Sequence, residues 1–273
     1  MNTDQFTKNG KYLMLALDHR GSFKKLMKPE NPDDVTDQQV VNLKTEIINS
    51  LMDQFSGLLV DEHFGLQAYP NHKKPFLLPV EKSGYTDQAG ERITELEYKI
   101  SDLVNLGASG AKLLLYYNPY IESHIIQQGV AKQVIAQAEK ANFPVFMELV
   151  TYTPDGKDYT QDPKFVLDSV NSFLDKGITP DVFKLEFPGN LEGCEQISRT
   201  LKDIPWILLT NPDSFDEFVE HIKTAAQAGC KGFLAGRALW KEVCSLQGDE
   251  KLHFLKVTLP DRFRKIAEIA ISS

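Results

Sequence analysis

The sequence predicts an α/β protein in which residues 1–273 form a single domain, a (β/α)8 TIM barrel. Three observations lead to this fold. The chain is close to the ~250 residues typical of that architecture. It contains eight short apolar runs, and segments of helical periodicity lie between most of them. The runs are apolar throughout, which is typical of parallel strands buried on both faces.

The eight runs follow one another along the chain at the spacing of β/α units. They cover residues 12–17, 57–60, 75–80, 111–116, 144–149, 181–185, 205–209 and 231–235. The link between the second and third runs, residues 62–74, is short and contains Pro70. We therefore expect an irregular segment or a very short helix there.

Two of the crossover helices have clear boundaries in the sequence. Thr36 and Gln39 have capping-box spacing ahead of a segment whose apolar residues share one helical face, and Gly57 follows its end. Ser214 and Glu217 repeat the box, with Gly229 as the stop.

An open, doubly wound sheet is the main rival fold. Such a sheet normally has a glycine-rich dinucleotide turn after its first strand, whereas residues 18–22 read DHRGS. Gly107, Gly110 and Lys112 do not have the spacing of a phosphate loop, and Leu113 stands where Ser or Thr is required. The barrel is therefore favoured.

The composition excludes several classes of partner. Thirty basic residues face 38 acidic ones, which gives a net charge of −8 with no basic cluster, so we expect neither nucleic acid nor an anionic membrane as a partner. The apolar runs are far shorter than the ~20 residues of a membrane span, and residues 1–11 contain no apolar signal core. These features predict a cytoplasmic protein. The three cysteines lack metal or disulfide spacing and are expected to be small buried side chains.

Polar residues that close the strand runs are the candidate site residues, because the carboxyl ends of barrel strands build the site. They are Asp18, Asp61, Glu81, Lys82, Lys112, Glu148, Lys184, Thr210, Gly236 and Arg237. Lys112, Glu148 and Lys184 come from three consecutive strands. Charged residues are rarely buried unless they are paired or functional, so this row needs an explanation.

A Schiff-base site explains the row. Neighbouring strands are about 4.8 Å apart, so Lys112 and Lys184 start on the order of 10 Å apart with Glu148 between them. A second ammonium group and a partly dry site favour the neutral amine that attacks a carbonyl. The carboxylate can then move the protons of carbinolamine formation, dehydration and carbon–carbon cleavage.

The same residues have a structural alternative. The lysines could point outward, or pair with Glu148 and Glu186 in ion pairs without a catalytic role. Alternation along a strand places Lys184 and Glu186 on one face, so Glu186 is equally a candidate site residue and a candidate charge partner.

An anion site is expected where the last strand ends. Arg237 follows Gly236 there and precedes a helix-like segment, and loops after the seventh and eighth barrel strands commonly bind phosphate. A second anionic group on the ligand would need another partner. Arg20, Lys82 and His63 are the candidates.

A metal site is not expected. The six histidines form no H-x-H or H-x-x-x-H pair, and none closes the fourth to eighth strands. Asp61, Glu62 and His63 form the only dense cluster of ligand types, but adjacent residues of an extended strand point alternately. We therefore expect no metal and no cofactor, and assign Asp61 and His63 to substrate binding.

Seven ordered segments between Tyr12 and Trp240 resemble the class I tagatose-1,6-bisphosphate aldolase family, which also includes sulfofructose-phosphate aldolases. They read LALDHRG, LLVDEHFG, VEKSGYT, GAKLLLYYNP, FMELVTY, DVFKLEFPG and GFLAGRALW. The resemblance implies that Lys184 forms the Schiff base, that Glu148 shuttles protons and that Lys112 tunes the nucleophile. It also implies that Asp18 binds substrate hydroxyls and that Gly236 and Arg237 hold the phosphate.

The sequence departs from that family at two places. His19 replaces the usual Gln after the first-strand aspartate. After the seventh strand the chain reads Thr210-Asn211-Pro212 where a Ser followed by Gly is expected. Thr210 keeps a hydroxyl group, but Pro212 has no N–H to offer a phosphate.

The sequence therefore predicts a metal-independent aldolase that cleaves a phosphorylated ketose, with tagatose 1,6-bisphosphate as the leading substrate, to dihydroxyacetone phosphate and an aldehyde. A sulfosugar phosphate is the alternative within this chemistry. A non-catalytic sugar-phosphate-binding regulator and a proton-transfer isomerase that uses Glu148 remain open, as does homo-oligomer formation.

Overall fold

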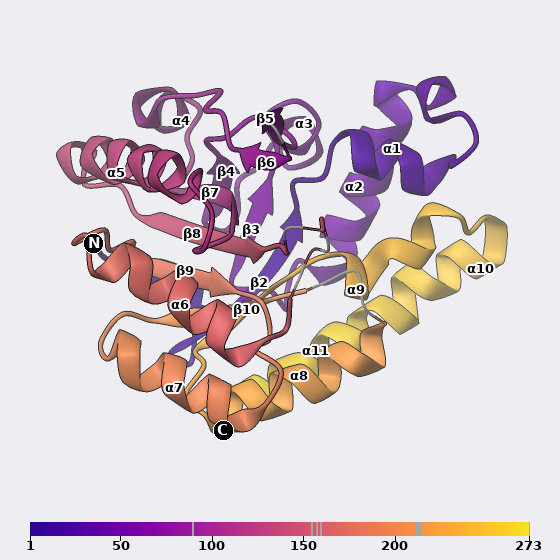
Figure 1. Cartoon of the computed structure of the whole chain (residues 1–273). Coiled ribbons are helices and arrows are strands. Elements are labelled where there is room, and N and C mark those ends of the chain that lie inside the picture. Colours follow the sequence, from indigo (N-terminus) through magenta and orange to yellow (C-terminus); the bar gives the residue numbers. More distant parts are fainter. Residues whose placement is uncertain (89, 154, 157, 159, 211–213, 273) are drawn as a thin grey trace.

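The computed structural model describes residues 1–88, 90–153, 155–156, 158, 160–210 and 214–272, and it confirms the predicted (β/α)8 barrel (Figure 1). The eight parallel strands are β2 (Lys11–Leu17), β3 (Gly57–Val60), β4 (Phe76–Pro79), β7 (Gly110–Tyr117), β8 (Val145–Thr151), β9 (Val182–Leu185), β10 (Trp206–Leu209) and β11 (Gly232–Ala235). They neighbour one another in the order β2-β11-β10-β9-β8-β7-β4-β3, and pairing of β2 with β3 closes the barrel. Each predicted apolar run overlaps one of these strands, and β2, β7 and β8 extend one or two residues beyond their runs.

Helices surround the strands, as Figure 1 shows. They are α1 (Gly21–Met27), α2 (Asp37–Leu51), α3 (Gly65–Ala68), α4 (Ile100–Asn105), α5 (His124–Ala141), α6 (Pro163–Leu174), α7 (Leu191–Leu201), α8 (Phe215–Gln227), α9 (Arg237–Trp240), α10 (Gly248–His253) and α11 (Leu259–Ile271). Short 3-10 turns cover Asp4–Phe6, Pro32–Asp34 and Lys241–Cys244, and a π-helical turn covers Phe254–Thr258. Within the described chain, no helix combines the length and the apolar character needed to cross a lipid bilayer.

The predicted starts of both capped helices and the stop of α8 are confirmed, whereas α2 ends at Leu51 and Gly57 is the first residue of β3. Thr36 with Gln39 and Ser214 with Glu217 both form complete capping boxes, at the starts of α2 and α8. Gly229 follows α8 with φ +94°, a left-handed conformation that ends the helix without steric cost. The link between β3 and β4 contains only the four-residue α3, as its length predicted.

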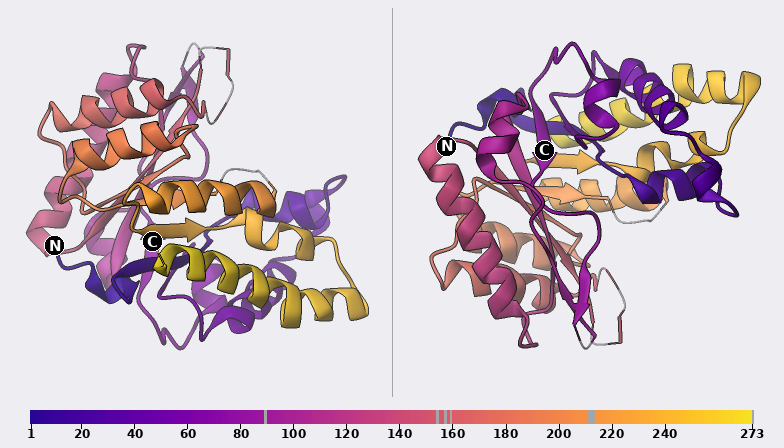
Figure 2. Two further views of the ribbon diagram at one scale, coloured as in Figure 1. Left: turned by 90° about the horizontal axis from the view of Figure 1, so that it is seen from below. Right: turned by 90° about the horizontal axis from the view of Figure 1, so that it is seen from above.

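Two antiparallel strand pairs were not predicted from the sequence. β1 (Thr7–Lys8) pairs antiparallel with β2 at the start of the chain. β5 (Thr86–Gln88) and β6 (Glu91–Ile93) form a separate hairpin between β4 and α4. Both views of Figure 2 show this hairpin extending beyond the helices.

Arg92 fixes the β5–β6 hairpin to the barrel. Its guanidinium carbon lies 4.7 Å from the ring centroid of Tyr85 and 4.5 Å from that of Tyr152, and its NH1 pairs with Asp158. The Arg92 side chain is buried, and its backbone N–H donates to the Tyr152 hydroxyl (3.1 Å). Cation–π contacts of a desolvated arginine are favourable, so the hairpin forms a defined wall beside the strand ends.

A small apolar cluster fills the barrel interior, separate from the larger core between strands and helices. Its members come from alternate strand positions and from the first turn: Phe6, Tyr12, Met14, Ala16, Leu59, Leu77, Phe146, Val182, Ile207 and Leu234. Phe6 closes the amino-terminal end of the barrel, with its ring 5.1 Å from Phe146. Gly57 leaves room for it, because a Cβ there would lie 2.9 Å from the Phe6 ring.

Gly232 is expected to be required for closing the barrel between β2 and β11. It pairs with Tyr12, has φ +128°, and a Cβ built on it would lie 2.1 Å from the Tyr12 carbonyl oxygen. Gly232→Ala should therefore lower the free energy of unfolding by about 2–4 kcal/mol in urea denaturation. Gly129→Ala, in α5 with open space around it, is the matched control and should raise stability by about 0.5–1 kcal/mol. Equal stability of the two variants would contradict this reading.

Candidate active site

A polar cavity of about 220 Å³ opens at the carboxyl ends of the strands. Side chains from seven of the eight barrel strands, or from the loops that follow them, line it. They are Ala16, Asp18, His19, Arg20, Ser22, Glu81, Lys82, Ser83, Gly84, Lys112, Leu114, Tyr116, Glu148, Val150, Lys184, Thr210, Leu234, Gly236 and Arg237. Most of the residues selected from the sequence therefore lie in one cavity.

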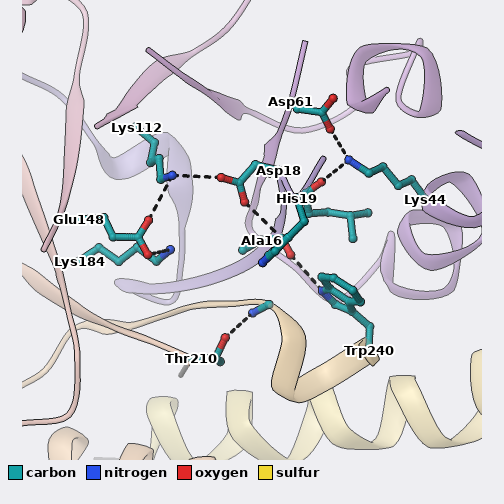
Figure 3. Close-up of polar contacts among 12 residues, drawn as sticks. Ala16, Asp18, His19, Lys44, Asp61, Lys112, Glu148, Lys184, Thr210 and Trp240 are labelled. Atoms are coloured by element: carbon teal, nitrogen blue, oxygen red, sulfur yellow. Dashed lines mark hydrogen bonds and ion pairs between the residues drawn. The ribbon is translucent and has the colours of Figure 1, made fainter. Parts of the chain in front are cut away.

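Glu148 lies between the two lysines, and all three residues line the cavity (Figure 3). Its Oε1 is 2.7 Å from Lys184 Nζ, and its Oε2 is 3.4 Å from Lys112 Nζ. All three residues are buried, with Lys112 3% and Lys184 5% exposed. The predicted Lys–Glu–Lys row is thus present. The charged group that Lys184 Nζ contacts is the Glu148 carboxylate and not the ammonium group of Lys112.

Strand register produces this row. Glu148 of β8 is directly paired with Lys184 of β9, so both side chains project to the same level of the barrel. On β7, Lys112, Leu114 and Tyr116 alternate with outward residues and all line the cavity. The inward direction of the charged residues therefore follows from the alternation that the sequence displays.

Three carboxylates surround Lys112. Its Nζ lies 2.6 Å from Glu81 Oε1 and 3.1 Å from Asp18 Oδ2, in addition to Glu148. Burial alone would lower the pKa of Lys112, but the three negative charges outweigh it and raise the pKa well above its ordinary value. Lys112 is therefore a fixed cation at neutral pH.

The carboxylates respond to the same charges. Burial favours the neutral form of Asp18 and Glu148, but Lys112 and Lys184 hold the pKa of each below its ordinary value. Burial raises the pKa of Glu81 in spite of its contact with Lys112. Glu148 is consequently ionised at neutral pH and can accept a proton.

Residues after β10 and β11 form one side of the cavity, opposite β4 and β7 in the circular strand order. The Gly236 N–H donates to Thr210 Oγ1 (3.0 Å), which joins the two loops. Arg237 begins α9 directly after Gly236 and lines the cavity. Asn211 and Pro212, which depart from the family pattern, lie outside the described residues.

His19, which stands where the family usually has Gln, lies next to Gly236. A Cβ on Gly236 would be 3.4 Å from His19 Cε1, and the imidazole ring meets Trp240 edge-on with the ring centroids 5.1 Å apart. Burial, reinforced by the positive charges of Arg237, Lys44 and Lys184, lowers the pKa of His19 to about 3 although Asp18 opposes the shift. His19 is therefore a neutral imidazole at neutral pH.

Arg20 and Lys82 line the cavity but are engaged with acidic residues. Arg20 NH1 lies 3.2 Å from Glu62 and 3.0 Å from Glu97, and Lys82 Nζ lies 2.7 Å from Glu95. Their place in the cavity agrees with the sequence prediction, and their ion pairs were not foreseen.

Three residues selected from the sequence lie outside the cavity. Asp61 is fully buried against Lys44 of α2 and accepts the Phe64 N–H, because the chain turns into α3 directly after β3. His63 is exposed and lies 3.3 Å from Asp37. The assignment of these two residues to substrate binding therefore has no support in the geometry.

Glu186 is the third residue outside the cavity. It accepts hydrogen bonds from the Thr151 N–H (3.1 Å), the Thr151 hydroxyl (2.8 Å), the Thr160 hydroxyl (3.2 Å) and the Gln161 N–H (3.0 Å). Strand β9 ends at Leu185, so the strand alternation that linked Glu186 to Lys184 no longer applies at this position. Glu186 anchors the segment after β8.

Glu81 and Tyr116 also line the cavity. Glu81 was selected from the sequence as a strand-end residue but was given no role, and its contact with Lys112 was not predicted. Tyr116 was not selected. Tyr116 shares the inward face of β7 with Lys112, a signal that alternation supplies.

Among the described residues, no group of three or more His, Cys, Asp and Glu side chains is arranged to hold a metal ion. The expectation of a metal-independent site stays a prediction.

Comparisons with known proteins agree with the fold and with the sequence resemblance. The profile of the family DUF2090, described as "Uncharacterized protein conserved in bacteria", matches residues 1–265. A protein of Staphylococcus aureus (strain JH9) named "Tagatose 1,6-diphosphate aldolase" is 29% identical over 258 residues, covering 83% of this chain and 79% of its own. The homologue of strain Newman gives the same values. The predicted relationship to tagatose-bisphosphate aldolases, which are carbon–carbon lyases, is confirmed.

Solved structures of low sequence identity share the fold. A crystal structure of an archaeal fructose 1,6-bisphosphate aldolase superposes with a TM-score of 0.71 at 18% identity, covering 99% of both chains. A structure of a Schiff-base-forming fructose-1,6-bisphosphate aldolase gives a TM-score of 0.69 at 19% identity, covering 98% of this chain and 99% of the other. These similarities support the barrel architecture.

The buried Lys44–Asp61 pair is predicted to stabilise the strand ends beside the cavity. Lys44 also donates to the Leu17 carbonyl (2.9 Å), and both charged side chains are 0% exposed. Lys44→Met leaves Asp61 buried without its partner and should cost about 3–5 kcal/mol of unfolding free energy. Adding Asp61→Asn removes the charge and keeps an acceptor for Phe64, so the double variant should recover most of the loss in urea denaturation. A double variant as unstable as the single one would refute this.

The buried carboxyl group of Glu186 is expected to make the stability of the protein depend on pH. Burial outweighs its four hydrogen bonds and raises its pKa to about 7, from an ordinary value of 4.5. The folded protein therefore holds a proton that the unfolded chain releases, and this stabilisation is lost as the pH rises from about 4.5 to about 7. Relative to Glu186→Gln, which cannot titrate, the wild type should lose on the order of 1–3 kcal/mol between pH 5 and pH 8. A constant difference across that range would argue against the raised pKa.

Proposed function

Because the chain belongs to the DUF2090 family and has homologues named tagatose-bisphosphate aldolase, we propose that it is a Schiff-base aldolase that cleaves a phosphorylated ketose to dihydroxyacetone phosphate and an aldehyde. One observation carries the proposal. Lys184 Nζ lies 2.7 Å from the Glu148 carboxylate in a buried pair at the base of a cavity that Arg237 also lines. A nucleophile within hydrogen-bond distance of its base is the arrangement that covalent catalysis requires.

Binding begins with the phosphate. Arg237, the Gly236 backbone and the Thr210 hydroxyl border the same side of the cavity, and a guanidinium can make bidentate contacts with phosphate oxygens. This side is formed by the loops after the seventh and eighth barrel strands, where barrels commonly hold phosphate. The ketone of the substrate then lies toward Lys184 on the neighbouring strand β9.

Schiff-base formation follows from the contact between Lys184 and Glu148. Transfer of a proton from Lys184 to Glu148 gives the neutral amine, which adds to the C2 ketone to form a carbinolamine. Glu148 returns the proton to the carbinolamine hydroxyl, which leaves as water, and the iminium remains. Lys112 stays charged throughout and stabilises negative charge that develops on substrate oxygens.

Cleavage uses the same carboxylate. Glu148 accepts the proton of the C4 hydroxyl, the bond between C3 and C4 breaks, and its electron pair moves into the iminium to give an enamine. The aldehyde leaves first. Protonation of the enamine at C3 and addition of water then release dihydroxyacetone phosphate and regenerate Lys184. Asp18, 3.1 Å from Lys112, lies where it can bind substrate hydroxyls.

The Staphylococcus aureus homologues are named for tagatose 1,6-diphosphate, which supports the substrate that the sequence predicts. No described residue favours a sulfonate over a phosphate. A regulator without turnover would have no need of the ionised Glu148 between two buried lysines. The cytoplasmic location and homo-oligomer formation remain predictions.

Reductive trapping tests the proposal. Incubation with dihydroxyacetone phosphate and borohydride should attach the three-carbon unit to Lys184, as located by peptide mass spectrometry. Lys184→Met should abolish the adduct while preserving the fold. Lys223→Met, which removes an exposed lysine paired with Glu220 on α8, is the control and should leave trapping unchanged. Calorimetric binding of dihydroxyacetone phosphate with Lys184 unmodified would refute the aldolase mechanism and would favour an isomerase or a regulator.

A further inference from the structure

The cavity has two dissimilar sides. Thr210, Gly236 and Arg237 belong to β10 and β11, and in the circular strand order β4 and β7 lie opposite them. The side formed by the loop after β4, together with Arg20, is here named the distal wall. It consists of Arg20, Glu81, Lys82, Ser83 and Gly84. A ketose phosphate anchored at Arg237 extends past Lys184 toward this wall.

Acidic groups outnumber cations at the distal wall. Arg20 is shared between Glu62 and Glu97, and its NH2 also donates to the Glu81 carbonyl (3.3 Å). Lys82 is paired with Glu95. Glu81 belongs to the wall and is paired with Lys112. Three cations therefore face four carboxylates in and beside the wall. A phosphate dianion placed here would have to displace carboxylates from Arg20 and Lys82.

The unpaired polar atoms of this region also fit hydroxyl groups. Within the described chain, two buried side-chain atoms of the distal wall make no hydrogen bond, Arg20 Nε and Glu81 Oε2. The first is a donor and the second is a carboxylate oxygen. A hydroxyl group can accept from the first and donate to the second, whereas a phosphate dianion has no proton to donate. Buried polar atoms left without a partner cost free energy, so a hydroxylated ligand is favoured.

We propose that the substrate carries a single phosphate, at C1, and that its far end is an uncharged, hydroxylated chain which binds the distal wall. This inference rests on the proposed aldolase function and replaces tagatose 1,6-bisphosphate by a ketose 1-phosphate. The chemistry at Lys184 is unchanged. Breaking the bond between C3 and C4 of a hexulose 1-phosphate gives dihydroxyacetone phosphate and glyceraldehyde, with the proton of the C4 hydroxyl accepted by Glu148.

Competition against trapping tests the inference without requiring turnover. D-glucitol 1-phosphate and D-glucitol 1,6-bisphosphate have no ketone, so they can protect Lys184 from the borohydride adduct only by occupying the cavity. The monophosphate should protect at an at least about tenfold lower concentration, because charge-assisted contacts and like-charge repulsion each change affinity by such factors. Better protection by the bisphosphate, or protection by neither compound, would overturn the inference.

Failure of the aldolase proposal would be seen separately. If dihydroxyacetone phosphate gives no adduct on Lys184, the two glucitol phosphates can still be compared by calorimetry. A tighter monophosphate would then support the single-phosphate site in a protein without Schiff-base chemistry. A tighter bisphosphate would again overturn it.

A charge variant tests whether the distal wall is what favours the monophosphate over the bisphosphate. Glu97→Gln removes one carboxylate from Arg20 and should shift the ratio of protecting concentrations toward the bisphosphate by about tenfold. Glu139→Gln makes the same charge change on α5, beside the amino-terminal end of the barrel, and should leave the ratio unchanged. Equal ratios in Glu97→Gln and the wild type would show that Arg20 and its carboxylates do not select the far end of the ligand.

Discussion

The contact of Glu148 with two lysines is the interaction on which the site depends. Lys112 and Lys184 are almost fully buried, and two ammonium groups so close to each other are tolerated only with compensating negative charge. Glu148 supplies that charge to both, at 3.4 and 2.7 Å. Its position is set by the register of β7, β8 and β9, so the chemistry of the site depends on the closure of the barrel.

The other carboxylates of the site give Lys112 and Lys184 different roles. Glu81 and Asp18 bind Lys112 in addition to Glu148, which makes Lys112 a permanent cation. Lys184 has Glu148 as its ion-pair partner among the described residues. A single proton transfer can therefore neutralise Lys184 and not Lys112. The same three carboxylates that stabilise the buried site thus leave one amine available for reaction.

Two further buried groups hold segments near the strand ends in place. Lys44 joins α2 to the ends of β2 and β3 through the Leu17 carbonyl and Asp61, directly beside Asp18. Arg92 joins the β5–β6 hairpin to Tyr152 and Asp158 after β8. Neither pair lines the cavity. Both fix loops that emerge from rigid strands, and preorganised loops position binding groups at little entropic cost.

The sequence by itself determined the eight strands, the capped helices α2 and α8, and the row formed by Lys112, Glu148 and Lys184. These features follow from local periodicity, which fixes the direction of each side chain as long as the strand continues. Tertiary structure alone decided the residues beyond the strand ends. Asp61 turns to Lys44 and Glu186 turns to Thr151, because the backbone leaves the strand there and alternation no longer fixes the side chain. The carboxylates around Arg20 come from segments far apart in the chain, so only the folded barrel brings them to one guanidinium.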